Sequence, residues 1–161
     1  MRTEARRQRV FLTFAAGDLA LARPVTARLY ASGGLTLDQG LTSEPFATVR
    51  GEIVRASLLT RLRRCTSALC LYGTRTLDDD WVRWTLETAA ELKLPLLGAP
   101  LPGVDAKDVE LFLTRLGAEL VPLDGENIAA RTREACRRPP SRALDAASLA
   151  ETLYLMRHPL R

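Results

Sequence analysis

The amino-acid sequence predicts a single α/β domain built on a five-stranded parallel sheet with helices on both faces. Its 161 residues are the usual length of one domain, and 47% of them are hydrophobic, which is enough for one buried core. Short apolar segments alternate along the chain with longer segments of helical periodicity. This alternation is typical of parallel strands joined by right-handed crossovers.

The first half of the pattern begins with a strand over residues 9–14, which are β-branched and aromatic. A short loop joins it to a helix pattern over residues 19–30. Pro24 lies inside this pattern, so the helix either begins near the proline or is kinked there. Two glycines end the helix, and residues 35–38 follow as a short second strand.

The middle of the chain supplies the central strand. A polar loop over residues 39–48 precedes residues 49–64, whose apolar side chains recur at helical spacing. Residues 67–72 are apolar without interruption before Gly73, as expected of a strand that is buried on both faces.

In the last third of the chain, helices and strands alternate again up to residue 138, and the alternation ends there. The expected elements are a helix over residues 81–92, a strand over 95–99, a helix over 109–116, a strand over 118–123 and a closing helix over 126–138. Two prolines then break the pattern, which divides the chain into a domain over residues 1–138 and a helical extension over 139–161. Within the extension, residues 144–156 predict an amphipathic helix that packs on the domain or on a second copy through Leu144, Leu149, Leu153 and Met156.

Charge and composition exclude several classes of protein. The net charge of +4 comes largely from arginine clusters at the N-terminus, at residues 61–64 and at residues 131–138. No aromatic residues interleave with these arginines, so we interpret them as solvated or helix-end cations and expect no nucleic-acid partner. No apolar run approaches the ~20 residues that cross a bilayer, and we expect neither a membrane partner nor export.

The spacing of the cysteines and the histidine predicts no metal site. Three cysteines are an odd number, and they share no metal-ligand spacing with the single histidine, His158. We therefore expect a cytoplasmic protein without a metal. Cys70 falls within the central strand and is expected to be inert.

Acidic residues gather in the loops that follow the first three strands. The carboxyl ends of parallel strands meet at one edge of the sheet, where such folds bind ligands. The loops bring to this edge Asp18, Asp38, Glu44 and the run from Asp78 to Asp80. These acids either serve a ligand or cap helices, and capping is the favoured interpretation for Asp18 and for Asp80, which precedes a helix. For Asp38 and Glu44 both alternatives stay open.

Several catalytic classes have no support in the sequence. No glycine-rich phosphate loop of the P-loop type occurs, because Gly33 and Gly34 follow a helix rather than a strand. No serine or cysteine lies in a nucleophile elbow, and the single histidine is close to the C-terminus, so a hydrolytic triad is not expected.

A set of short motifs nevertheless resembles a known family. The motifs are Arg9-Val10-Phe11-Leu12-Thr13-Phe14-Ala15 with Asp18, Ser43-Glu44-Pro45-Phe46, Arg64-Cys65-Thr66-Ser67, Trp81-Val82-Arg83-Trp84, Pro95 with Gly98, and Leu123-Asp124 with Asn127-Ile128. Together they resemble the bacterial TIR-like domains of Thoeris anti-phage defence. The Trp-Val-x-Trp element after the central strand is the most specific of them.

The resemblance implies a flavodoxin-like fold that binds NAD and, in active members, converts it to an ADP-ribose-type signal for a separate effector protein. It also implies an oligomer or a second defence protein as a partner. Nucleotide contacts are expected from Phe14, Ala15, Asp18, Asp38, Phe46, Gly73, Trp81, Trp84 and Thr85. Both tryptophans either stack on a ring of the nucleotide or cover the sheet as apolar bulk.

The catalytic acid departs from the family pattern. A glutamate is expected directly after the second tryptophan, and the residue at that position is Thr85. Glu87 and Glu44 are the candidate replacements. At ~100° per residue, Glu87 falls on the opposite side of the helix from Thr85, beside Arg83. Thr85 is expected at the edge of the ligand crevice.

Two other functions compete with an NAD-consuming enzyme. The first is a catalytically degenerate TIR-like module that binds a nucleotide or a protein without chemistry, for which Thr85 is the indication. The second is a phosphoacceptor receiver domain, which shares the order of elements. The receiver is disfavoured, because only Asp18 follows the first strand and Gly73 ends the third, where receivers carry an acid pair and an aspartate.

Overall fold

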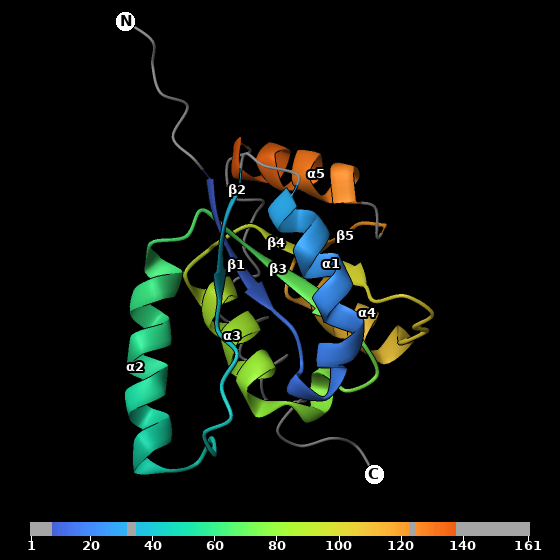
Figure 1. The fold of residues 1–161 in the computed structure, drawn as a ribbon. Coiled ribbons are helices and arrows are strands. Elements are labelled where there is room, and N and C mark those ends of the chain that lie inside the picture. Colours follow the sequence, from blue (N-terminus) through green and yellow to red (C-terminus); the bar gives the residue numbers. More distant parts are fainter. Residues whose placement is uncertain (1–7, 32–34, 123–124, 138–161) are drawn as a thin grey trace, which may run out of the picture.

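The chain folds into a parallel α/β domain in the computed structural model, which describes residues 8–31, 35–122 and 125–137 (Figure 1). The strands are β1 (Gln8–Thr13), β2 (Leu35–Gln39), β3 (Ser67–Tyr72), β4 (Leu96–Pro100) and β5 (Glu119–Leu120). They form one sheet in the order β2-β1-β3-β4-β5, and all neighbouring pairs are parallel. The predicted five-stranded, flavodoxin-like α/β fold is therefore confirmed.

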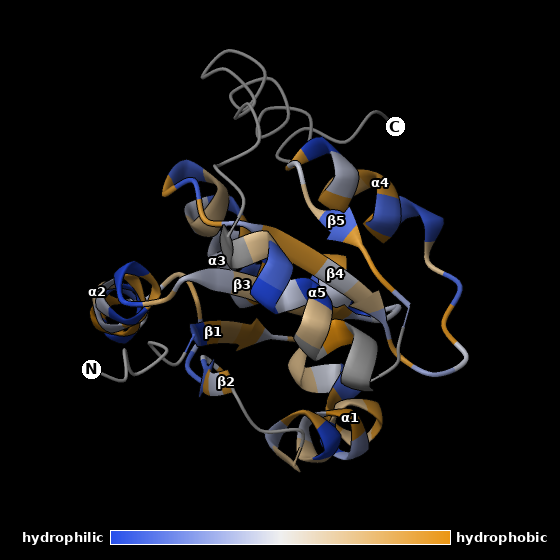
Figure 2. Ribbon diagram, turned by 90° about the horizontal axis from the view of Figure 1, so that it is seen from above, coloured by the Kyte–Doolittle hydropathy of each residue, from blue (hydrophilic) through white to orange (hydrophobic). Residues whose placement is uncertain are grey.

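Helices cover both faces of the sheet. They are α1 (Leu19–Ala31), α2 (Val49–Arg63), α3 (Asp80–Glu91), α4 (Lys107–Arg115) and α5 (Gly125–Arg137). One apolar core joins the sheet to α1 and α5, and a second core joins the other face to α2, α3 and α4. Figure 2 shows α1 and α5 on one side of the strands, with α3 and α4 on the other.

The central strand follows the sequence pattern closely. All six residues of β3 are buried. Alternate side chains serve the two cores: Ala68, Cys70 and Tyr72 face one, and Leu69 and Leu71 face the other. An uninterrupted apolar run is what a strand between two helical layers requires.

Two of the expected elements differ from the structure. The fifth strand was expected over residues 118–123, yet β5 has two residues. The N–H of Val121 still donates to the carbonyl of Gly98 at 2.8 Å, and Pro122 follows with no N–H to continue the ladder. The first helix does not begin at Pro24, because α1 runs from Leu19 through it, and the alternative of a kink at Pro24 stays a prediction. Pro24 and Ala20, one turn earlier, are both exposed, so water can bond the carbonyl that the missing N–H leaves open.

The C-terminal extension lies outside the described residues, so the helix expected over residues 144–156 stays a prediction. Short one-turn helices, η1 (Ala16–Asp18) and η2 (Thr76–Asp78), follow β1 and β3. Among the described residues, no helix has both the length and the apolar character of a membrane span.

Candidate functional site

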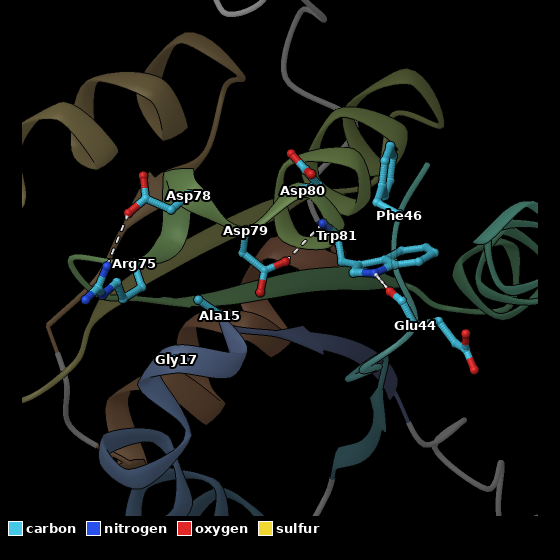
Figure 3. Close-up of a pocket in the computed structure, with 9 residues that line it drawn as sticks. All are labelled: Ala15, Gly17, Glu44, Phe46, Arg75, Asp78, Asp79, Asp80 and Trp81. Carbon is cyan, nitrogen blue, oxygen red and sulfur yellow. Dashed lines mark hydrogen bonds and ion pairs between the residues drawn. The ribbon is translucent and has the colours of Figure 1, made fainter. Parts of the chain in front are cut away.

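A wide cleft opens at the carboxyl ends of the first three strands. The order of the sheet reverses between β1 and β3, and flavodoxin-like sheets bind ligands outside such a point. The cleft has a volume of about 490 Å³. It is lined by Ala15 and Gly17 after β1, Glu44 and Phe46 after β2, and Arg75, Asp78, Asp79, Asp80 and Trp81 after β3 (Figure 3).

One wall of the cleft is aromatic. The Trp81 indole N–H donates to the backbone carbonyl of Glu44 at 2.7 Å, which fixes the loop after β2 against the start of α3. Phe46 meets Trp81 edge to face, with ring centroids 5.0 Å apart and planes at 74°. The Arg55 guanidinium lies 4.6 Å from the Phe46 ring and donates to the Phe46 carbonyl at 2.7 Å. These contacts hold two aromatic rings in fixed positions at one side of the cleft.

The opposite wall carries the positive charge of Arg75. Its guanidinium is 3.9 Å from the Asp78 carboxylate, and both side chains are largely exposed, at 68% and 73%. An exposed ion pair of this kind contributes little to stability. Arg75 is therefore able to exchange Asp78 for a phosphate oxygen, which a guanidinium binds well.

Asp79 lies between the two walls and joins the loops. Its Oδ1 accepts hydrogen bonds from the N–H groups of Trp81 at 3.0 Å and Val82 at 3.3 Å, and its Oδ2 accepts from the N–H of Ala16 at 3.0 Å. The first two bonds make Asp79 the N-cap of α3. The sequence prediction that Asp80 caps this helix is wrong, because Asp79 has the extended backbone of an N-cap and Asp80 is already helical. Asp80 forms an ion pair with Arg83 instead of capping.

A second, narrow cavity adjoins the wide cleft. It is lined by Leu12, Thr13, Phe14, Gln39, Gly40, Leu41, Thr42, Asp79, Trp81, Val82 and Thr85. Its volume of about 10 Å³ is no more than one water molecule needs. Asp79 and Trp81 line both cavities and thus form the partition between them. Thr85, where the family pattern has a glutamate, is 3% exposed and faces this narrow cavity.

Asp18 and Gly73 lie beside the cleft without lining it. Asp18 is 6% exposed, and burial raises the pKa of its carboxyl above the usual value despite the nearby Arg75. Its Oδ2 has no hydrogen-bond partner among the described residues. A Cβ on Gly73 would lie 2.4 Å from that oxygen, so only glycine leaves room for the carboxyl. Asp18 is the last residue of η1 and directly precedes α1, and its predicted role as the cap of α1 stays a prediction.

The structure brings some of the expected residues together and separates others. Ala15, Glu44, Phe46 and Trp81 share the wide cleft, and Phe14, Trp81 and Thr85 share the narrow cavity. Asp38 lines neither cavity. It binds Arg61, whose Nε donates to its Oδ1 at 2.9 Å. The Arg61–Asp38 pair fixes α2 to the edge strand β2, which explains the aspartate structurally.

Neither candidate catalytic glutamate lies at the centre of the cleft. Glu44 lines it, yet Figure 3 shows its carboxylate directed outward, away from Asp79. Glu87 is half-buried on α3 and lines neither cavity. Trp84 is also outside both cavities and packs edge to face on Trp81, 6.4 Å away.

Sequence reasoning missed Arg75, Gly17 and the central place of Asp79. The signal for Asp79 was present, because the aspartate run follows the central strand and one of its members had to begin α3. Arg75 had no signal, because a lone arginine in a loop has no periodicity or spacing to mark it. In the described part of the chain no group of three or more His, Cys, Asp or Glu residues is placed to hold a metal ion.

The chain matches no model of a known protein family and no curated protein.

Proposed function

We propose that this chain is a TIR-like domain of bacterial anti-phage defence that binds NAD in the wide cleft and converts it to an ADP-ribose-type signalling nucleotide. The observation that carries the proposal is the position of the cleft. It lies at the point where the strand order reverses and has an aromatic wall facing an arginine wall. Its volume is within the range of about 300–1,000 Å³ that is usual for small-molecule sites.

The two walls fit the two parts of a dinucleotide. The aromatic pair of Phe46 and Trp81 suits a nicotinamide or adenine ring. Arg75 suits the pyrophosphate, and Gly17 lets a ligand approach the backbone at the start of α1, where helix N–H groups favour negative charge. The carboxylates that line the cleft repel the phosphates of NAD, so in this proposal the attraction of Arg75 is what allows NAD to bind.

Cleavage needs a carboxylate near the ribose. As the bond between nicotinamide and ribose breaks, positive charge develops on the sugar, and a fixed carboxylate lowers the energy of that state. Asp79 is already committed to three backbone N–H groups. Glu44 is therefore the candidate acid in this proposal, and its side chain has to turn inward from the rim when NAD binds.

A second candidate function is binding without cleavage. The position that holds the catalytic glutamate in the family is the buried Thr85, and it faces a cavity with space for one water molecule. This observation favours a degenerate module that binds a nucleotide, pairs with another copy, or pairs with an active sibling.

One experiment separates the two functions. The purified chain is titrated with NAD by calorimetry, and nicotinamide release is followed by chromatography, with and without lysate from phage-infected cells as a source of the trigger. An NAD-converting enzyme releases nicotinamide, and Glu44→Gln lowers the rate by about 100-fold or more, whereas the exposed-acid control Glu91→Gln does not. Binding that Arg75→Gln weakens, without any release, indicates the binding module. If NAD neither binds nor is cleaved, the NAD-converting enzyme and the nucleotide-binding form of the degenerate module both fail.

A further inference from the structure

The charges of the wide cleft are unevenly distributed. Among the described residues that line it, four carry a carboxylate and one carries a guanidinium: Glu44, Asp78, Asp79, Asp80 and Arg75. Figure 3 shows Arg75 and its partner Asp78 at one end of the cleft, with the aromatic pair, Phe46 and Trp81, at the other. The cation of the lining is therefore set apart from the two rings.

The aromatic end of the cleft is negatively charged. Glu44 is held beside Trp81, because its backbone carbonyl accepts the indole N–H at 2.7 Å, and its carboxylate forms no ion pair within the described part of the chain. Asp80 directly precedes Trp81 and pairs with Arg83, a residue that is not part of the lining. Neither carboxylate is neutralised by a cation that lines the cleft.

Aromatic rings and carboxylates together favour an organic cation as a ligand, because both attract positive charge. The Phe46 ring already attracts one cation, since the Arg55 guanidinium lies 4.6 Å from its centroid without lining the cleft. The carboxylates do not attract a neutral ring, and they repel a phosphate.

We propose that the wide cleft selects its ligand by positive charge on a ring, and that its aromatic end takes an N-substituted pyridinium cation. The oxidised nicotinamide of NAD belongs to this class, and the phosphates then lie toward Arg75. The reduced cofactor has a neutral ring and binds more weakly. Only the part that concerns NAD rests on the proposed function, because the charge selection applies to any pyridinium.

A matched pair of small ligands tests the charge selection without NAD. 1-Methylnicotinamide has a positive charge on its ring nitrogen, and nicotinamide is neutral. NMR titration of the full chain follows two indole N–H signals, because Trp81 lines the cleft and Trp84 does not. We expect 1-methylnicotinamide to shift the Trp81 signal with about tenfold higher affinity than nicotinamide. Equal affinities, no binding of the cation, or a shift confined to Trp84 overturns the proposal.

Two variants with opposite expected effects separate charge from shape. Glu44→Gln removes a carboxylate and weakens 1-methylnicotinamide by about threefold, while nicotinamide is unaffected. Arg75→Gln removes the cation of the lining, so it tightens 1-methylnicotinamide by about twofold and weakens NAD. Glu52→Gln is the matched control, because Glu52 is exposed in the first turn of α2 and lies outside the lining. Equal changes for both small ligands in Glu44→Gln would indicate altered shape and overturn the charge selection.

The dinucleotide arm compares NAD with its reduced form, NADH, by calorimetry. We expect the oxidised form to bind about tenfold more tightly. If both bind equally, the charge selection fails and the proposed function still stands. If neither binds but 1-methylnicotinamide is selected over nicotinamide, the proposed function fails and the cleft is a site for another pyridinium cation.

Discussion

The wide cleft and the narrow cavity lie side by side and share Asp79 and Trp81, yet one holds about 490 Å³ and the other about 10 Å³. The wide cleft is built from the loops after β1, β2 and β3 and the start of α3, and it is open to solvent along exposed charged side chains. The narrow cavity is built from the ends of β1 and β2, the loop residues that follow them and the buried face of α3. Loops therefore make the space for a ligand here, and the motif position that holds the catalytic acid in the family belongs to the packed region instead.

Trp81 separates the wide cleft from the narrow cavity and is expected to matter most for keeping them apart. The side chain is 9% exposed, contacts Phe46 and Trp84, and holds the loop after β2 through its indole N–H. Trp81→Ala removes the partition and joins the two cavities. We expect the free energy of unfolding to fall by about 3–5 kcal/mol, measured by urea denaturation.

The half-buried Trp84 provides the control for this change. Trp84→Ala leaves both cavities lined as before and is expected to cost less than Trp81→Ala. Equal costs for the two variants would show that Trp81 acts as apolar bulk and not as a partition.

Thr85→Glu tests whether the narrow cavity can take the acid of the family pattern. The added atoms exceed the available space, and the carboxyl enters a buried site, so we expect a loss of about 1–3 kcal/mol in the free energy of unfolding. Burial should also raise the pKa of the new carboxyl, so the loss grows as pH rises. Thr85→Gln has the same size without the charge and should show no such growth.

The same variant tests chemistry. If the cavity opens to admit the ribose, Thr85→Glu creates or raises nicotinamide release from NAD, and Glu87→Gln changes little. A wild type that already cleaves NAD, and loses this activity in Glu87→Gln without loss of folding, would make Glu87 the catalytic acid.

The fold was more accessible from the sequence than the site was. The run over residues 67–72 identifies the central strand because, after Ser67, it is the continuous apolar segment that a strand buried on both faces requires. The loops carry no such periodicity. Asp18 and Asp38 are acids that follow or end strands, and their sequence positions look alike. The structure shows that Asp18 is buried beside Gly73, whereas Asp38 forms an ion pair with Arg61, 23 residues later in the chain. Likewise, three successive aspartates did not reveal which one caps α3.

The smallest expected effect concerns Asp18, which lies beside the wide cleft and lines neither cavity. Burial raises the pKa of its carboxyl in the folded state above the value of about 3.9 that the unfolded chain has. The folded state therefore binds the proton more tightly, and the stability that this gives is complete below the unfolded pKa. It is lost as pH rises through the window up to the raised, folded pKa.

Asp18→Asn removes this titration, so the stability of the variant relative to wild type should rise across that window and then stay level. Each unit of pKa shift corresponds to about 1.4 kcal/mol. Urea denaturation between about pH 3.5 and 8 measures the difference, with Asp105→Asn as the exposed control. A wild type that gains stability over Asp18→Asn as pH rises would mean that the attraction of nearby Arg75 outweighs burial. Asp18 would then be held as a carboxylate, and ionisation would tighten the contact between the two loops of the wide cleft rather than loosen it.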